Sequence, residues 1–264
     1  MQIVKLALKR VLFITECDDL LFEILIYQTF NYKKQSQMKN IVIIGGSKGI
    51  GRAILEQQLE INKVFMISRT AAEIAHPNLA HFQLDALKDP LPEIAFVDVL
   101  IYCPGTINLK PISSLSLDDF RNDFEINVIG AVKAIQHYLP KLKQGVRPSI
   151  LLFSTVAAKL GMPFHASIAT AKAGIEGLVK SLGAELAPTI RVNAVAPTIT
   201  ETSLAAGILR NDRIKESMAE RHPLKSFLQP DEVASMADFL LSDKAMSISG
   251  QIFEMDYGIV SFKI

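Results

Sequence analysis

NIVIIGGSKGIG, residues 40–51, is the stretch that decides the fold. It begins as a short run rich in β-branched residues, which is typical of a strand buried in a parallel sheet. It ends on Gly45, Gly49 and Gly51, and a helical spacing of apolar residues follows to residue 61. Glycines between a strand and a helix permit a tight turn and let the backbone approach a pyrophosphate at the positive end of the helix. The stretch therefore predicts a dinucleotide-binding turn, and a glycine turn without a ligand is the alternative.

Strand and helix patterns alternate along the rest of the chain. Further strands are expected at residues 63–68, 81–86, 97–105, 148–155, 190–197 and 250–256, and long helices at 116–142, 167–187 and 230–242. Ser116 followed by Asp118 and Asp119 is typical of a helix cap with an acidic first turn. This alternation predicts an α/β fold: a single doubly wound Rossmann-type domain with a seven-stranded parallel sheet flanked by helices on both faces.

The composition fits such a domain and argues against several classes of function. Of the 264 residues, 49% are hydrophobic and 21% are charged, so the chain can bury a large core. The net charge of +1, with scattered Lys and Arg, gives no reason to expect nucleic acid as a partner. Cys17 and Cys103 fit no metal spacing. We therefore expect no metal, no disulfide framework and a cytoplasmic location.

Residues 1–37 differ in character from the rest of the chain. They begin basic and turn apolar, but four acidic residues interrupt the apolar run. That pattern argues against a secretory signal and against a membrane span, which needs about 20 apolar residues. We interpret residues 1–37 as an N-terminal extension outside the domain or a mis-assigned start, and residues 38–264 as the dinucleotide-binding domain. A helix packed on the domain surface is the alternative for the extension.

The end of the second expected strand indicates which dinucleotide is preferred. A carboxylate is usual there when the ribose 2′-hydroxyl is bound, but this chain has Ser68, Arg69 and Thr70. Lys48 lies inside the glycine turn, near the same end of the sheet. Two cations and a hydroxyl suit a 2′-phosphate, which arginine can bind through two parallel hydrogen bonds. We therefore expect NADP(H) in preference to NAD(H), with ordinary surface charges as the alternative.

Several segments together carry a resemblance to a known family. They are GGSKGIG (45–51), LDA (84–86), YCPG (102–105), FEINVIGAV (124–132), STVAAKLGMP (154–163), TAKAGIEGLVKSLGAELA (170–187), IRVNAVAPTITET (190–202), HPLKSFLQPDEVA (222–234) and GQIFEMDYG (250–258). In this order they resemble the short-chain dehydrogenase/reductase family, in particular its acyl-carrier-protein-reductase-like branch, from about residue 41 to about residue 259. So many segments in the family's order are specific for the fold and less specific for the reaction.

The resemblance implies roles for particular residues. For the cofactor it implies Gly45, Ser47, Lys48, Gly49, Ile50, Gly51, Arg69, Asp85 (adenine), Ala86, Gly105 (adenine ribose), Lys172 (nicotinamide ribose), Pro197 and Thr202 (nicotinamide carboxamide). For catalysis it implies Lys172, Asn127 as the holder of a relay water, and Thr155 in place of a serine that orients the substrate carbonyl. It also implies a homodimer or homotetramer, because the helices of Asn127 and Lys172 form the subunit interface in family tetramers.

The chain departs from the family pattern where the family's proton donor stands. The tyrosine four residues before Lys172 is Ile168. The other departures are YCPG in place of an asparagine-rich motif, Ile44, Thr155, Pro197-Thr198 for Pro-Gly, and Asp256-Tyr257-Gly258 for Asp-Gly-Gly. Hydride delivery to a carbonyl carbon leaves an alkoxide that must be protonated, and a placed acid contributes about 10²–10⁴-fold. Isoleucine has no proton to give, so another group must supply it.

His165 is the substitute donor that we favour. It lies seven residues before Lys172, about two helical turns, which is the Tyr-x6-Lys spacing of enoyl-reductase relatives. A histidine can donate a proton near neutral pH, whereas a surface loop residue is the alternative. Tyr102 and Cys103 are further candidates, each with a packing role as its alternative.

The predicted function is an NADP(H)-dependent short-chain oxidoreductase acting on a small carbonyl or enoyl substrate with a non-standard proton donor. Two alternatives stay open. One is a pseudoenzyme that binds NADP(H) as a sensor or scaffold, and the other is a purely structural subunit that completes an oligomer.

Overall fold

The computed structural model describes residues 38–71 and 73–262, so the interpretation of residues 1–37 lies outside the described residues. Within them the chain forms a seven-stranded sheet in the order β3-β2-β1-β4-β5-β6-β7, and all its strand pairs are parallel. The strands are β1 (Asn40–Ile44), β2 (Lys63–Ser68), β3 (Leu79–Gln83), β4 (Val99–Tyr102), β5 (Ser149–Phe153), β6 (Arg191–Pro197) and β7 (Ile252–Met255). The predicted seven-stranded parallel sheet is confirmed.

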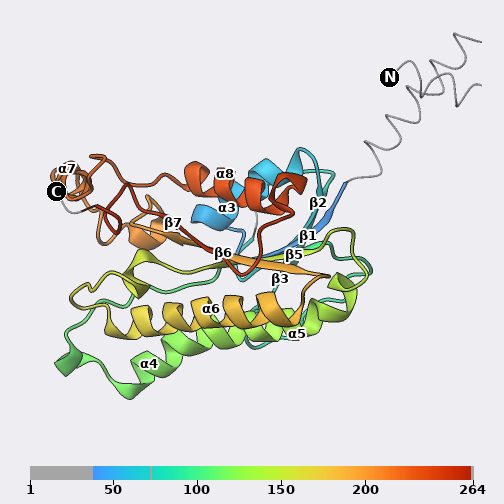
Figure 1. Cartoon of the computed structure of the whole chain (residues 1–264), viewed down its shortest axis with the longest axis horizontal. Helices are drawn as coiled ribbons and strands as arrows, with labels where there is room; N and C mark the ends of the chain where they lie inside the picture. The colour runs from blue at the N-terminus through green and yellow to red at the C-terminus, as the bar shows by residue number, and fades with distance from the viewer. Residues whose placement is uncertain (1–37, 72, 263–264) are drawn as a thin grey trace, which may run out of the picture. The chain divides into compact units, whose positions relative to one another are not determined.

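Helices cover both faces of the sheet, as Figure 1 shows. On one face lie α3 (Gly49–Leu59) and α8 (Pro230–Leu241), and on the other lie α4 (Leu117–Phe124), α5 (Gly130–Leu142) and α6 (Ala166–Glu185). Each face has its own buried core: Ile54 and Leu240 belong to the first, and Ile135 and Val179 to the second. Because both faces are covered, the central strands are apolar throughout rather than alternating.

The strand order reverses at β1, which pairs with β2 on one side and with β4 on the other. Ile44, the last residue of β1, is in register with Ile67 and with Tyr102. In such sheets the loops at the carboxyl ends of the two neighbouring strands run apart and leave a crevice. The glycine turn after β1 and the YCPG segment after β4 both lie at this edge.

The expected helix at 116–142 is present, with an interruption that the sequence pattern did not predict. It runs as α4, a π-helical turn η3 (Glu125–Ile129) and α5. Ser116 caps α4: its hydroxyl accepts from the Asp119 backbone N–H at 3.1 Å, and the Asp119 carboxylate accepts from the Ser116 N–H at 2.9 Å. A π-turn is uncommon and is often found at functional sites, and this one carries Asn127.

Some boundaries differ from the expected ones. β3 begins and ends earlier than 81–86, so Asp85 follows the strand instead of lying within it. The segment between β6 and α8 contains the short turn η5 (Ser203–Ala205) and α7 (Asp212–Glu220). The remaining short helical turns are η2 (Ile112–Ser114), η4 (Val156–Ala158) and η6 (Asp243–Ala245).

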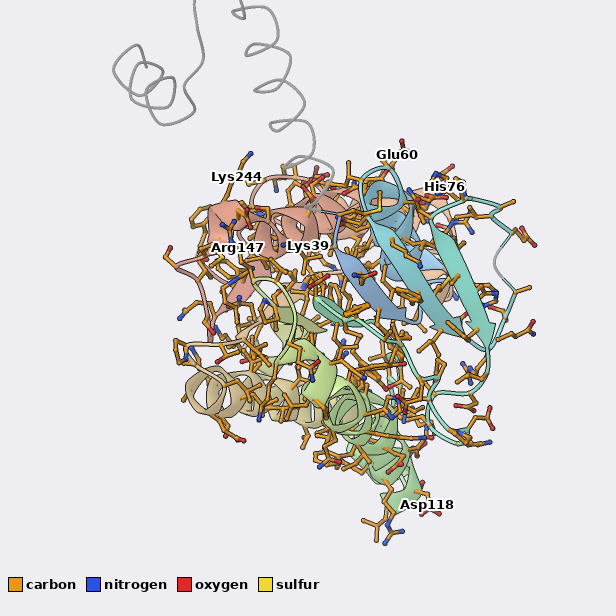
Figure 2. The ribbon with its side chains drawn as sticks, turned by 90° about the vertical axis from the view of Figure 1, so that its right-hand side faces the viewer. Lys39, Glu60, His76, Asp118, Arg147 and Lys244 are labelled. Atoms are coloured by element: carbon orange, nitrogen blue, oxygen red, sulfur yellow. The ribbon has the colours of Figure 1, made fainter. Side chains whose placement is uncertain are left out.

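Charged side chains lie on the outside of both helical layers. Figure 2 shows Glu60 and Lys244 beside the layer of α3 and α8, and Asp118 at the end of the opposite layer. None of the helices in residues 38–71 and 73–262 combines the length and apolarity that a membrane crossing requires. In the same ranges, no group of three or more histidine, cysteine or carboxylate side chains could hold a metal ion.

Candidate active site

The glycine turn at the end of β1 has the backbone that a pyrophosphate requires. Gly45 and Gly49 have φ angles of +83° and +56°, a region that residues with a side chain rarely adopt. A Cβ on Gly51 would lie 2.2 Å from the Gly45 carbonyl oxygen, so only glycine fits there. Lys48 is the N-cap of α3, and its side chain caps no backbone N–H of the helix. The first-turn N–H groups are thus free to bind an anion, and the turn fits a dinucleotide phosphate.

The two cations expected at a 2′-phosphate lie near this turn. Lys48 and Arg69 are both exposed, and within the described part of the chain neither forms an ion pair. The hydroxyl of Thr70 donates to that of Ser47 at 2.9 Å, which ties the end of β2 to the glycine turn. The segment with Arg69 and the turn with Lys48 are therefore neighbours in space. Ile50, in the first turn of α3, packs partly buried against the core on that face.

Asp85 lies just beyond β3, at the same edge of the sheet. The N–H of Leu84 donates to the Ser68 carbonyl at 3.0 Å, which brings this segment beside the end of β2. One carboxylate oxygen of Asp85 accepts from the Leu87 N–H at 3.0 Å. Asp85 and Ala86 are both half-buried, a position from which a side chain and a backbone can contact a ligand in the crevice.

Lys172 is buried in α6, where β5 ends. Its ammonium donates to the Phe153 carbonyl at 2.9 Å, and only 8% of the residue is exposed. Burial lowers the pKa of Lys172 to about 8, although the charge of the Asp123 carboxylate acts in the opposite direction. An amine with this pKa can gain and lose a proton near neutral pH, as general acid–base groups do.

Asn127 and Lys172 both approach the same side of Gly105. The amide N–H groups of Asn127 donate to the Asp123 carbonyl at 2.7 Å and to the Thr106 hydroxyl at 3.2 Å. Its amide oxygen is buried and has no partner among the described residues. A Cβ on Gly105 would lie 3.4 Å from both this oxygen and the Lys172 Nζ. The fold therefore brings together three of the residues singled out from the sequence.

The loops after β5 and β6 complete the edge. Thr155 follows β5, and its hydroxyl makes a long hydrogen bond of 3.4 Å to the carbonyl of Pro197, the last residue of β6. Thr202 reaches back to the glycine turn, because a Cβ on Gly49 would lie 3.1 Å from its Cγ2. Residues 155, 197 and 202 thus surround the same crevice as the glycine turn.

His165, the favoured substitute donor, lies at the start of α6. It is the N-cap residue of α6 and is half-buried, and its Nδ1 lies 2.7 Å from the Pro163 carbonyl oxygen. Since a carbonyl only accepts, Nδ1 carries a proton and Nε2 is the nitrogen left for other partners. In the described part of the chain, no hydrogen bond joins His165 to Lys172, Asn127 or Thr155. Ile168 itself is 5% exposed.

Tyr102 and Cys103 have structural surroundings. The Tyr102 hydroxyl donates to the Ile126 carbonyl at 2.6 Å and so provides a partner within the π-turn, where regular helical bonding is interrupted. Burial raises the pKa of the Tyr102 phenol, and it raises the pKa of the Cys103 thiol to about 12. Both groups therefore stay protonated at neutral pH, which supports packing roles.

The sequence reasoning missed Asp123. This residue lies in α4, one turn before Asn127, and only 1% of it is exposed. Its spacing of four residues from Asn127 was a usable signal, because residues i and i+4 share a helix face. The sequence alone did not single out this feature: a carboxylate on the buried face of a helix, near a lysine whose charged form is disfavoured by burial.

Comparisons with known proteins agree with this geometry. A family model described as Enoyl-(Acyl carrier protein) reductase matches residues 85–260. The 3-oxoacyl-[acyl-carrier-protein] reductase FabG of Aquifex aeolicus is 30% identical over 244 residues, which cover 84% of this chain and 98% of that protein. Carbonyl reductase [NADPH] 2 of Sus scrofa is 26% identical, over 83% of this chain and 96% of its own length.

A comparison with solved structures points to the same family of proteins. A short chain dehydrogenase family protein from Francisella tularensis superposes with a TM-score of 0.77 at 25% identity, and the match covers 85% of this chain and all of that one. Fold and site together define an NAD(P)-dependent oxidoreductase of the Rossmann type. The chain belongs to the short-chain dehydrogenase/reductase family.

Proposed function

We propose that this oxidoreductase uses NADP(H) and acts on a small carbonyl or enoyl compound, with a proton donor other than tyrosine. When bound, the dinucleotide supplies or accepts the hydride. The observation that carries the proposal is the buried ammonium of Lys172, flanked by Asn127 at the sheet edge that also holds the glycine turn. Hydride transfer to a carbonyl leaves an alkoxide, and hydride transfer to an enoyl compound leaves an enolate. Either product needs a group at that edge that can give a proton.

The preference for NADP(H) is supported by charge. Lys48 and Arg69 offer two cations at the glycine turn, and β2 ends on Ser68 without a carboxylate to repel a 2′-phosphate. A hydrogen bond to a charged group contributes about 1.5–3 kcal/mol, which is about 10- to 150-fold in affinity. The name of the Sus scrofa relative also specifies NADPH.

Calorimetric titration of NADPH and NADH tests this preference. Arg69→Ala and Lys48→Ala are each expected to weaken NADPH binding by about 10-fold or more and to leave NADH binding unchanged. Lys180→Ala, which removes an exposed cation from α6, is the matched control and should change neither. Equal affinities for the two dinucleotides in the wild-type protein would refute the preference.

For the proton donor we favour Lys172 over His165. The ammonium has three N–H groups, and the Phe153 carbonyl uses one of them. The pKa of about 8 keeps it mostly protonated at neutral pH while making it a better acid than an ordinary lysine. His165 remains the rival, with Nε2 as its donor atom.

A panel of small ketones, aldehydes, 3-oxoacyl thioesters and enoyl thioesters, with NADPH consumption as the readout, tests the reaction. On any substrate found, Lys172→Met is expected to lower turnover by about 10²–10⁴-fold. His165→Gln should leave turnover within about threefold of wild type; a loss in the general-acid range would make His165 the donor.

The pseudoenzyme alternative rests on Ile168, which occupies the tyrosine position. It predicts that the wild-type protein binds NADPH but turns over no member of the panel, and that Ile168→Tyr gains ketone reduction. That pair of results would refute the reductase proposal and retain the cofactor proposal.

We also propose that the protein is a homodimer or homotetramer joined through the outer face of α4 and α6. An open hollow of about 510 Å³ on this face is lined by Phe120, Phe124 and Ala171, among others, and Phe124 is 41% exposed. An apolar hollow on an outer helix face is a typical interaction surface. Light scattering after gel filtration should give a dimer or tetramer mass, and Phe124→Glu should reduce it to the monomer mass.

A further inference from the structure

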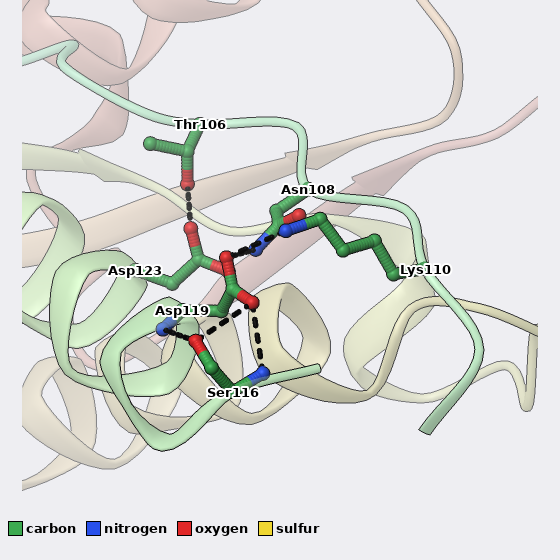
Figure 3. A network of polar contacts seen from close by, with 6 residues as sticks. All are labelled: Thr106, Asn108, Lys110, Ser116, Asp119 and Asp123. Carbon is green, nitrogen blue, oxygen red and sulfur yellow. Dashed lines mark hydrogen bonds and ion pairs between the residues drawn. The ribbon is translucent and has the colours of Figure 1, made fainter. Parts of the chain in front are cut away.

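Asp123 is a buried carboxylate that is only half satisfied. Its Oδ1 accepts from the Thr106 hydroxyl at 2.6 Å (Figure 3). Its Oδ2 is buried as well and has no hydrogen-bond partner among the described residues. A buried charge without a partner is costly, so such a residue is expected to have a counter-charge nearby.

Asp119, one turn earlier in α4, shows what an ordinary carboxylate of this helix does. It accepts from Lys110 at 2.8 Å, from Asn108 at 3.2 Å and from Ser116, and all these contacts are drawn in Figure 3. The Lys110 ammonium, with the Ser116 groups, holds the pKa of Asp119 well below its usual range. The charge of Asp119 is thus balanced within its own surface network, whereas that of Asp123 is not.

Among the described residues, Lys172 is the buried cation at this end of the sheet. The Thr106 hydroxyl that donates to Asp123 also accepts from the Asn127 amide, whose own oxygen lies, like the Lys172 Nζ, 3.4 Å from the position of a Cβ on Gly105. The polar chain Asp123–Thr106–Asn127 therefore leads from the carboxylate to the lysine. An unpartnered oxygen lies at each end: Asp123 Oδ2 at one, and Asn127 Oδ1 at the end where the Lys172 ammonium has unused N–H groups.

The other titratable groups around Lys172 do not supply the negative counter-charge of its ammonium. The Cys103 thiol, after β4, is neutral because its burial raises its pKa to about 12. Glu176, on α6, accepts a hydrogen bond from Ser154, and Glu125 of the π-turn lines the outer hollow. β5 contains no titratable residue, η4 contains none, and β6 contains only Arg191, at its opposite end.

We propose that Asp123 is the counter-ion of Lys172: held by Thr106 and Asn127, it favours the protonated form of the lysine and thereby positions the acid of the reaction. The use of this acid rests on the proposed function. When the ammonium protonates the product oxygen, one N–H bond breaks, one O–H bond forms and a neutral amine remains. The carboxylate then favours return of a proton from water to that amine.

The electrostatic part can be tested without substrate or cofactor. The full chain, labelled with ¹³C at lysine Cε, is titrated by NMR, and Lys172→Met identifies the signal of Lys172. Asp123→Asn keeps the size of the side chain and removes its charge, so the Lys172 midpoint should fall by about one unit or more. Asp119→Asn, one turn away, is the matched control and should leave that midpoint unchanged. An unchanged midpoint in Asp123→Asn overturns the proposal.

A second measurement does not depend on the folding of Asp123→Asn. In the wild-type chain labelled at the aspartate carboxyl carbons, the Asp123 signal should show an additional inflection at the Lys172 midpoint, because coupled groups report each other's titration. In Lys172→Met, that inflection should vanish. The Asp119 signal in the same spectra should show no such inflection. An Asp123 signal that is insensitive to Lys172 refutes the proposal.

The failure of the proposed function is distinguishable from failure of this inference. If the substrate panel gives no turnover while the two titrations remain coupled, Asp123 is the counter-ion of a lysine with another use. If a substrate is found, the rate of reduction should fall as the pH rises through the Lys172 pKa, because the acid loses its proton. Asp123→Asn should move that fall to lower pH, and Asp119→Asn should not; a profile unmoved by Asp123→Asn counts against the inference.

Discussion

Gly130→Ala is expected to destabilise the domain, although alanine is the better helix former by about 1 kcal/mol. The new Cβ would lie 2.0 Å from the Tyr102 hydroxyl oxygen and 2.6 Å from a methyl carbon of Leu87. Tyr102 is 3% exposed, and its hydroxyl donates to the Ile126 carbonyl at 2.6 Å, so it cannot move without losing that hydrogen bond. Overpacking and a lost buried hydrogen bond outweigh the helix propensity, and we expect a net loss of about 3 kcal/mol.

A double-mutant cycle measures this effect by denaturant unfolding. Tyr102→Phe alone should cost about 1–3 kcal/mol, because the Ile126 carbonyl loses its partner. With that hydroxyl gone, Gly130→Ala should cost at least about 1 kcal/mol less than it does in the wild-type protein. Gly177→Ala is the control: it lies exposed in α6 with no atom within 4 Å of a new Cβ, and should gain up to about 1 kcal/mol. Strictly additive losses would refute the reasoning.

Three further outcomes are expected. Gly51→Ala should abolish NADPH binding in a fluorescence titration, because its Cβ would lie 2.2 Å from the Gly45 carbonyl oxygen; unchanged affinity would contradict the role of the turn. The unfolding free energy should rise between about pH 8 and 10.5, where unfolded Lys172 is protonated and folded Lys172 is not, and Lys172→Met should lack this part of the slope. His222→Phe should cost about 1–3 kcal/mol by denaturant unfolding, since the buried ring contacts the Thr198 hydroxyl and a carbonyl of α7, both at 2.8 Å; a neutral result would count against that contact.

Part of the site followed from the sequence by spacing alone. The glycine turn was predictable because a strand, a turn and a helix within twelve residues allow only a few backbone arrangements. His165 illustrates the limit of the same argument. A spacing of seven residues places two side chains on one face only inside a helix, and His165 is the N-cap of α6, so spacing alone does not fix where its side chain points.

What the sequence by itself determined is the order and type of the elements, because caps, turns and apolar periodicity depend on residues a few positions apart. Only the tertiary structure decided the π-turn at Asn127, where a hydroxyl from β4 meets a helix carbonyl. It also decided the state of Lys172, because desolvation and the nearby Asp123 arise from segments that are distant along the chain and meet only after folding. A local pattern reports which groups are present, whereas their burial and their neighbours determine which of them can exchange a proton.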